Sequence, residues 1–285
     1  MSDSGAYRLV GGKPATQHSF CALLDVLGFT QAVREAERQG KSAELLEKFS
    51  FLVRNWFTTL GDVFAIEWEQ QRQREYRVFT DNVIVGGPLS AGSRADLQFT
   101  IEDLALLQLG LLAEGFFVRG GMSVGQLWID DLVVYGGALI DAHEAEQRAR
   151  SPRIVLHENA VSIVTHEVRL YFNTYRERRG HRFTDAILVD RDGKWFINYL
   201  ARLFDRGMFD PDYAALDLHR STVEAKLEQY TGDERIYPKY QWCASYHNYF
   251  CGTVPRGSEY LLSGNIPDLT IRPVEDVIIP EHPAA

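Results

Sequence analysis

The 285-residue sequence contains few cysteines: only Cys21, Cys243 and Cys251, which form neither a CxxC pair nor a Cys/His cluster. An odd number of scattered cysteines does not build a disulfide framework, so a reduced, cytoplasmic chain is expected. The eight histidines show no metal-ligand spacing such as HExxH, which argues against a zinc site.

Basic charge and long apolar runs are also scarce. The sequence contains 30 Lys and Arg residues and 39 Asp and Glu residues, so the formal net charge is −9. An acidic protein lacks the general attraction to phosphate backbones, and nucleic acid is therefore not an expected partner. The most apolar stretch, residues 104–118, is interrupted by Gln108 and Glu114 and predicts a buried helix running into a strand, not a membrane span. Residues 1–17 carry no signal-peptide pattern and are expected to form a flexible tail.

The hydrophobic periodicity predicts an α+β fold. Before residue 170 it indicates strands and helices in the order strand, helix, helix, hairpin, helix, hairpin, helix, strand, with a further strand possible over 63–68. The hairpins imply a largely antiparallel sheet. Glycines within 116–128 suggest a bulged strand. After residue 170 we expect a hairpin turning at Asp192–Gly193 and then helices packed on the core. The individual ranges expected are strands at 20–24, 116–128 and 153–157, helices at 31–39, 45–60, 96–113 and 138–149, and a hairpin around 81–82.

Two acids end apolar strands, and they are the residues of most chemical interest. Asp25 follows the run FCALL, and Asp81 lies at the tip of a predicted hairpin. A carboxylate beside an apolar core is costly unless it is paired or binds a cation, and two such acids on adjacent strands suit a pair of divalent metals. The alternative is structural: Asp25 would cap the next helix, and Asp81 would be only a turn residue.

Four sequence blocks, in order, resemble class III nucleotidyl cyclases. They are DVLGFT, FTDNVIV, VRGGMSVGQL and GGALIDAHEAEQRARSPRIVL, which together span about residues 20–156. The later words KWFINYL and YPKYQW resemble the pyrimidine cyclases of bacterial Pycsar anti-phage systems. The resemblance implies a ferredoxin-like cyclase core at 18–205 and a C-terminal helical extension, packed on that core, at 206–285.

The resemblance also implies a metal site. Asp25 and Asp81 would bind two divalent ions, Mn²⁺ or Mg²⁺, and the backbone carbonyl of Val26 would complete one coordination shell. The ions would promote attack of the ribose 3′-hydroxyl on the α-phosphorus of a nucleoside triphosphate and stabilise the leaving pyrophosphate.

The same resemblance assigns the triphosphate to a turn that enters a helix. Backbone N–H groups at such a turn point at an anion, and the helix dipole adds positive potential. The residues of this turn are Gly28, Phe29 and Thr30.

Two residues expected in an active family member are missing. The family's Asn aligns with Ile140 and its Arg with Glu144, so transition-state charge needs another cation or the chain is inactive. Arg148, one helical turn beyond Glu144, is the candidate catalytic substitute. Arg119 and Lys194 are further candidates for phosphate contact. For each of these cations the alternative is a solvated or structural role.

Base selectivity is predicted from two aligned positions. Arg77 occupies the position where adenylate cyclases commonly carry Lys, and Val133 the position where they carry Asp. Uracil offers carbonyl acceptors and no amino donor, so a multi-donor cation without an acceptor acid suits UTP. The alternatives are CTP or ATP as substrate, or an inactive nucleotide-binding homologue. The resemblance further implies a homodimer and a separate effector protein that reads the cyclic nucleotide.

Overall fold

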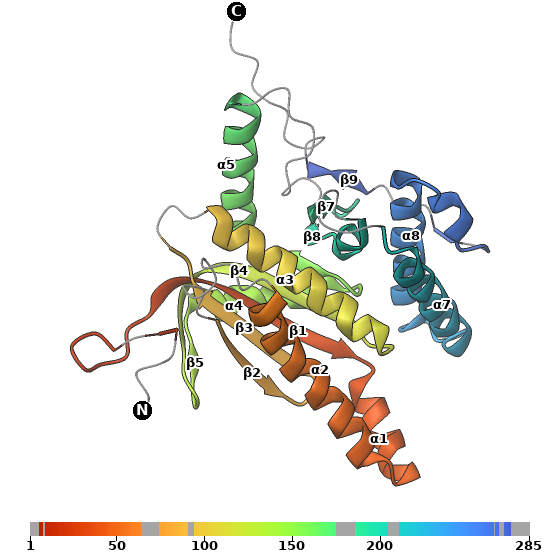
Figure 1. Cartoon of the computed structure of the whole chain (residues 1–285), viewed down its shortest axis with the longest axis horizontal. Helices are drawn as coiled ribbons and strands as arrows, with labels where there is room; N and C mark the ends of the chain where they lie inside the picture. The colour runs from red at the N-terminus through yellow and green to blue at the C-terminus, as the bar shows by residue number, and fades with distance from the viewer. Residues whose placement is uncertain are drawn as a thin grey trace, which may run out of the picture.

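A computed structural model describes residues 6–7, 9–63, 74–90, 94–174, 186–204, 211–264, 266–267 and 271–274 (Figure 1). The strands within these residues are β1 (Gln17–Leu27), β2 (Glu75–Phe79), β3 (Asn82–Pro88), β4 (Phe117–Ile129), β5 (Val134–Tyr135), β6 (Ile154–Leu156), β7 (Ile187–Val189), β8 (Trp195–Ile197) and β9 (Arg272–Pro273). The helices are α1 (Phe29–Gln39), α2 (Ser42–Val63), α3 (Arg94–Ala113), α4 (Gly137–Ala149), α5 (Glu158–Thr174), α7 (Tyr213–Gln229) and α8 (Tyr237–Thr253), with short 3₁₀ helices η2 (Tyr199–Phe204) and η3 (Gly257–Tyr260).

All of these strands belong to one sheet. Its order is β2-β3-β1-β4-β6-β8-β7-β9, and β5 pairs with the end of β4. The β4–β6 pair is parallel, whereas the other pairs are antiparallel. The predicted α+β class with a mostly antiparallel sheet is therefore confirmed.

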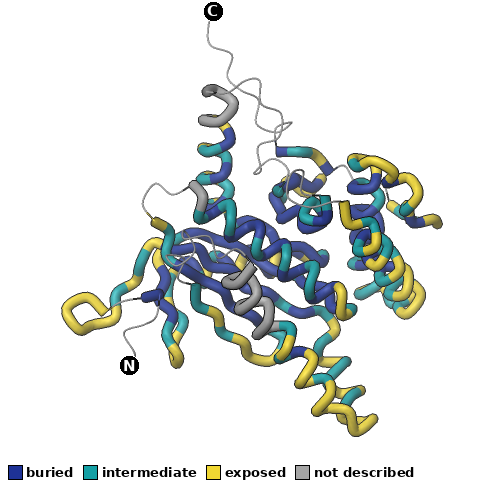
Figure 2. The backbone as a smooth tube through the Cα atoms, in the orientation of Figure 1, coloured by how far each residue is buried: buried dark blue, intermediate teal, exposed yellow. Residues whose placement is uncertain are grey.

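Alternation along β1 sends its side chains to two separate hydrophobic clusters. Phe20 and Leu24 join the main core, to which α3 contributes Ile101. Cys21 and Leu23 face the opposite way and join a smaller cluster with small alanines of α4. Because successive strand residues point to opposite faces, Asp25 lies on the α4 side, directly beyond Leu23. Figure 2 shows the central strands as the most buried part of the chain.

The glycines of β4 allow α4 to pack closely on the strand, and they do not form the expected bulge. The β1–β4 register runs without a break through Gly120 and Gly121. A Cβ added to Gly121 would lie 2.1 Å from the carbonyl oxygen of Ala142. The α4 backbone therefore packs directly on the strand, which places the residues of α4 next to the ends of β1 and β4.

The C-terminal helices share the core of the sheet. Leu216 of α7, with Tyr240 and Phe250 of α8, belongs to the main hydrophobic cluster. The hairpin expected at Asp192–Gly193 forms between β7 and β8, with Gly193 at a φ of +76°. These residues of the described part of 206–285 thus pack on the core.

The N-terminal segment differs from the flexible tail expected over residues 1–17. Ala6 and Tyr7 are buried, and Tyr7 packs on Trp128 with ring centroids 6.0 Å apart. The backbone N–H of Ala6 donates to the carboxylate of Glu75 at 2.9 Å.

Two further expectations concern a strand at residues 63–68 and membrane-spanning helices. Of the strand proposed for 63–68, Val63 is instead the last residue of α2, and the remainder lies outside the described residues. Within the described helices, none combines the length and apolarity that crossing a bilayer requires.

Candidate active site

Asp25 lies near the C-terminal end of β1, between two neighbouring strands. In the register it faces Arg119 of β4 on one side and Asn82 of β3 on the other. Its carboxylate accepts a hydrogen bond from the Arg119 guanidinium, with Oδ2 2.7 Å from Nη2. The side chain is 21% exposed, so the carboxylate remains open to a ligand.

The same guanidinium reaches a second carboxylate, on α4. Nη2 of Arg119 lies 2.6 Å from Oε1 of Glu146, although the contact lacks hydrogen-bond alignment and leaves Oε1 and Arg119 Nε without hydrogen-bond partners. Burial raises the pKa of Glu146, Arg119 acts to lower it, and the nearby Asp25 acts to raise it again. One partly buried cation, Arg119, is thus shared between two acids.

Asp81 is brought to the same end of the sheet by the β2–β3 hairpin. The backbone N–H of Val26 donates to the carbonyl oxygen of Asp81 at 2.8 Å, which ties the hairpin tip to the end of β1. The Asp81 carboxylate accepts hydrogen bonds from Thr80 Oγ1 at 2.8 Å and Asn82 Nδ2 at 3.0 Å. The two acids predicted from the sequence therefore lie on adjacent chain segments.

The donor types at this point fit a hard divalent cation. Mg²⁺ and Mn²⁺ prefer carboxylate and carbonyl oxygens, which Asp25, Asp81 and the backbone of Val26 supply. No ready-made cluster of three or more His, Cys, Asp or Glu side chains occurs in the described part of the chain, so these two carboxylates would bind metal together with ligand oxygens and water.

The turn after β1 leaves backbone donors beside these acids. Gly28 adopts a left-handed conformation, with φ of +80°, and α1 begins at Phe29. The first N–H groups of a helix have no partner within it. Thr30 lies inside the first turn of α1, and Gly28 is the N-cap residue. The Phe29 ring packs on Phe49 with centroids 4.6 Å apart, which fixes the turn on the core.

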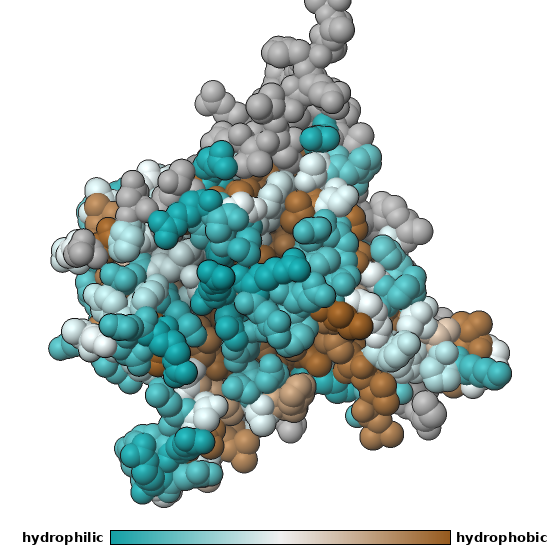
Figure 3. Space-filling model, turned by 180° about the vertical axis from the view of Figure 1, so that it is seen from behind, coloured by the Kyte–Doolittle hydropathy of each residue, from teal (hydrophilic) through white to brown (hydrophobic). Residues whose placement is uncertain are grey.

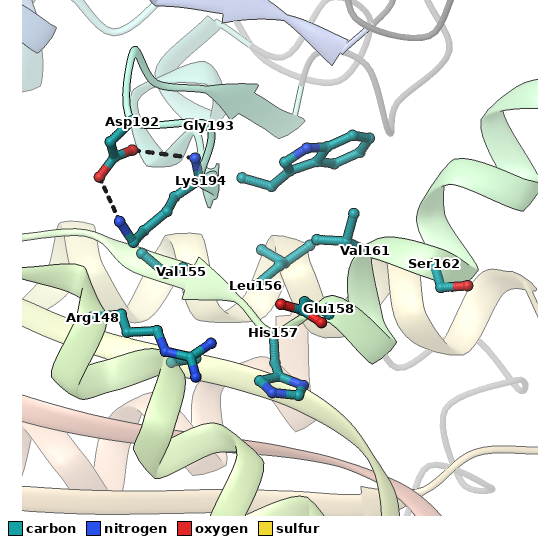
Figure 4. A pocket seen from close by; sticks show the side chains of 12 residues that line it. Arg148, Val155, Leu156, His157, Glu158, Val161, Ser162, Asp192, Gly193 and Lys194 are labelled. Carbon is teal, nitrogen blue, oxygen red and sulfur yellow. Dashed lines mark hydrogen bonds and ion pairs between the residues drawn. The ribbon is translucent and has the colours of Figure 1, made fainter.

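Arg148 and Lys194 lie together in a different place. Both line a cavity of about 490 Å³ that is bordered by α4, β6, α5 and the β7–β8 turn (Figure 4). Asp25, Asp81 and Arg119 are absent from its lining. Arg148 pairs with Glu144 at 3.1 Å and Lys194 with Asp192 at 2.8 Å. The structure thus groups these two cations with each other and not with the two acids of the site.

The Arg77 side chain hydrogen-bonds to the β4–β5 turn. Its Nε donates to the carbonyl oxygen of Asp130 at 2.7 Å, and its Nη2 donates to the carboxylate of Asp131 at 3.2 Å. Val133, in the same turn, is about half exposed and does not belong to the core. The two positions that the sequence links to base selection are therefore close along one surface.

Two residues of this region were not predicted as site residues. Glu146 appears in the cyclase-like block of the sequence but had no role assigned. Lys239 lies in the YPKYQW segment, some 200 residues beyond Asp25, and periodicity gives no means of placing it. A sequence pattern reveals such a residue only when the tertiary contact is known.

No protein-family model and no curated protein matches the sequence, but solved structures do. The guanylate cyclase domain of RhGC from Catenaria anguillulae in complex with GTP is 10% identical, with 64% of this chain and 96% of that chain covered and a TM-score of 0.42. A class III adenylyl cyclase-like ATP-binding protein from Pseudomonas aeruginosa is 14% identical, with 52% and 34% covered and a TM-score of 0.39. A bacterial light-regulated adenylyl cyclase is 11% identical, with 73% and 57% covered and a TM-score of 0.39.

This chain thus spans about a third of the Pseudomonas protein and just over half of the light-regulated cyclase. Identities and TM-scores this low leave the activity and the substrate to be decided from the site itself.

Proposed function

We propose that this chain is a nucleotidyl cyclase that converts a nucleoside triphosphate, preferentially UTP, to its 3′,5′-cyclic monophosphate and pyrophosphate. The observation that supports the proposal is that Asp25 and Asp81 lie on hydrogen-bonded neighbouring chain segments, beside the turn that opens α1. Carboxylates next to unpaired backbone N–H groups are the two parts that a metal-bound triphosphate needs.

The residues of the chain would divide the work between them. Two divalent ions held by Asp25, Asp81 and the carbonyl of Val26 would activate the ribose hydroxyl and neutralise the pyrophosphate as it leaves. The N–H groups of Gly28, Phe29 and Thr30 orient the phosphates. Arg119, which contacts Asp25 and Glu146, would donate to a phosphate oxygen.

The preference for UTP rests on Arg77 and Val133. Asp131, which pairs with Arg77, has a 98% exposed side chain, and exposed pairs contribute little to stability. Arg77 can therefore exchange this partner for a carbonyl of the base at small cost. Val133 offers no acceptor to an amino group, which disfavours adenine and cytosine.

A second candidate function is nucleotide binding without turnover. Ile140 and Glu144 stand where the family has the transition-state Asn and Arg. The structure pairs Arg148, the expected substitute, with Glu144 and places it in the separate cavity. The presence of both proposed metal ligands, Asp25 and Asp81, favours catalysis over this alternative.

The decisive experiment incubates the purified chain with each of UTP, CTP, ATP and GTP in Mn²⁺ or Mg²⁺ and separates the products by chromatography. We expect cyclic UMP and pyrophosphate as the main products, and no product after chelation of the metal. Equal kcat/KM for ATP and UTP would refute the base preference. Nucleotide binding without any cyclic product would establish the second candidate.

We also propose a head-to-tail homodimer, because the base-selecting surface of one subunit would face the acids of its partner. By the resemblance to Pycsar cyclases, the cyclic nucleotide would be a defence signal read by a separate effector. Arg77→Ala should lower or relax the preference for UTP, and an unchanged preference would remove Arg77 from base recognition.

A further inference from the structure

The C-terminal helices reach the turn that opens α1. At the end of α7, the hydroxyl of Tyr230 donates to the side-chain oxygen of Gln31 in α1, at 3.0 Å. The Tyr230 ring stacks on Tyr240 of α8, with centroids 5.5 Å apart and planes 11° apart. Tyr240 in turn meets Phe117, at the start of β4, edge to face at 5.2 Å. The α7–α8 corner is therefore fixed to the elements that carry the candidate active site.

Lys239 precedes Tyr240 in the first turn of α8. Burial lowers the pKa of Lys239, and the Arg119 and Arg235 guanidinium groups lower it further, while Asp25 and Asp233 act in the opposite direction. The ammonium group is thus within electrostatic range of both Arg119 and Asp25. Lys239 is half-buried and forms no ion pair with a described residue.

A partly buried ammonium that has no ion-pair partner is costly, and an anion that reaches it would be bound favourably. Asp25 and Glu146 already contact Arg119. When Asp25 binds a metal ion, that ion neutralises its negative charge, which then no longer balances Arg119 or Lys239. Arg119 then keeps Glu146 alone, and Lys239 has no ion-pair partner among the described residues, so both cations are available to the anion that enters with the metal, which in the proposed function is a polyphosphate.

We propose that Lys239 is a phosphate-binding residue of the active site, supplied by the C-terminal segment α7–α8. This inference rests on the proposed cyclase function and gives the C-terminal helices a part in it. Lys239 and Arg119 hold the polyphosphate together with the N–H groups of the α1 turn. The extension therefore completes the site and does not merely cover the sheet.

The test measures binding of inorganic tripolyphosphate with Mg²⁺ by calorimetry, and the KM for UTP with Mn²⁺. Lys239→Ala should raise the dissociation constant about tenfold or more, because a charge-assisted hydrogen bond to phosphate is lost. Lys239→Arg should retain most of the affinity. Lys226→Ala is the matched control: Lys226 is also half-buried, on α7, and contacts Gln229, so its loss should leave the affinity unchanged.

The outcomes separate this inference from the proposed function. Unchanged tripolyphosphate affinity and KM in Lys239→Ala, or no binding by the unmodified chain, would overturn the role of Lys239. Binding that depends on Lys239 without any cyclic product would overturn the cyclase proposal and leave the phosphate site intact. If Lys239→Ala does not fold, as shown by its thermal melt, Lys239→Gln carries the same test.

Discussion

At the scale of single residues, Asp25 is held by charge and not by packing. Its carboxylate contacts Arg119, and that guanidinium keeps Glu146 as a second partner. Removing the charge of Asp25 therefore leaves no buried cation unpaired, and the fold should tolerate it. The functional cost should be much larger, because two carboxylates are the anchor of the proposed metal pair.

We predict that Asp25→Asn and Asp81→Asn each lower turnover by at least about a hundredfold, which corresponds to the several kcal/mol that metal stabilisation supplies. The thermal midpoint should change little, as measured by circular dichroism. Glu44→Gln, on the exposed side of α2, is the control and should keep full activity. Unaltered product formation by either Asp variant would exclude that residue from metal binding.

The sequence alone predicted Asp25 and Asp81 as candidate site residues. It did not predict which cations lie near them, and the reason is physical. Asp25 and Asp81 stand out because an acid at the end of an apolar strand is unusual. The cations Arg148 and Lys194 do not stand out in this way, since only tertiary contacts decide which anion a long side chain meets. The same limit hid Lys239, which reaches the site from a helix more than 200 residues away in sequence.

At the scale of elements, the approach of α4 to β4 determines the geometry of the site. Glu146 contacts Arg119 only because Gly121 lets the α4 backbone lie directly on the strand. The sequence predicted both elements within a few residues but interpreted the glycines as a bulge. Periodicity reports which face of a strand is buried, and it does not report how closely the covering helix approaches.

Gly121→Ala should destabilise the chain by about 1–3 kcal/mol, because the new methyl group overlaps backbone atoms of α4. Turnover should fall with it as Glu146 moves away from Arg119. Gly110→Ala is the matched control: Gly110 lies in α3 and an added Cβ there meets nothing within 4 Å, so stability should be kept or improved. Chemical denaturation of both variants decides the matter, and equal stabilities would contradict the close packing.

Helices α7 and α8 are joined by a buried chain of neutral groups. His247 Nε2 lies 2.8 Å from the carbonyl oxygen of Tyr260, so this nitrogen is the donor. Nδ1 of His247 is then the acceptor for Nδ1–H of His219, at 2.9 Å. Nε2 of His219 remains to accept from the Tyr199 hydroxyl, also at 2.9 Å. One arrangement of protons satisfies every group, and it requires both imidazoles to be neutral.

Lowering the pH should therefore weaken the packing of α7 against α8. Burial, together with His247, lowers the pKa of His219 well below its ordinary value, and burial also lowers the pKa of His247. The unfolded chain binds protons below about pH 6.5 while the folded chain does not, so stability is complete above that pH and declines below it. The slope should approach about 1.4 kcal/mol per pH unit for each histidine.

Urea denaturation between pH 7.5 and 5.5 measures this slope. His219→Asn should be less stable at pH 7.5 but should lose less stability on acidification. His18→Gln, at an exposed position, should follow the unmodified chain throughout. A His219→Asn slope equal to that of the unmodified chain would show that the histidine pair does not titrate with unfolding.

At the scale of the whole molecule, the chain leaves apolar side chains exposed around the β4–β5 turn and the start of α4. Leu132 is 93% exposed, Tyr135 68% and Ile140 63%. Figure 3 shows apolar surface at the lower part of the rear face. Arg77 borders this surface through its contacts with Asp130 and Asp131. An apolar patch beside Arg77 suits the proposed homodimer, because a two-fold interface uses the same patch on both subunits.

If this patch forms the dimer, Leu132→Asp combined with Ile140→Glu should give a monomer that is folded but inactive, since two buried charges without partners oppose association. Light scattering gives the mass, and the NTP assay gives the activity on the same sample. Leu261→Glu, at an exposed position in the C-terminal segment, should remain dimeric and active. Because Asp25, Asp81 and Lys239 all belong to one chain, the monomer should still bind tripolyphosphate with Mg²⁺ while forming no cyclic nucleotide. A monomer with full turnover would show that one chain completes the site, and would place base recognition within the same subunit as the metals.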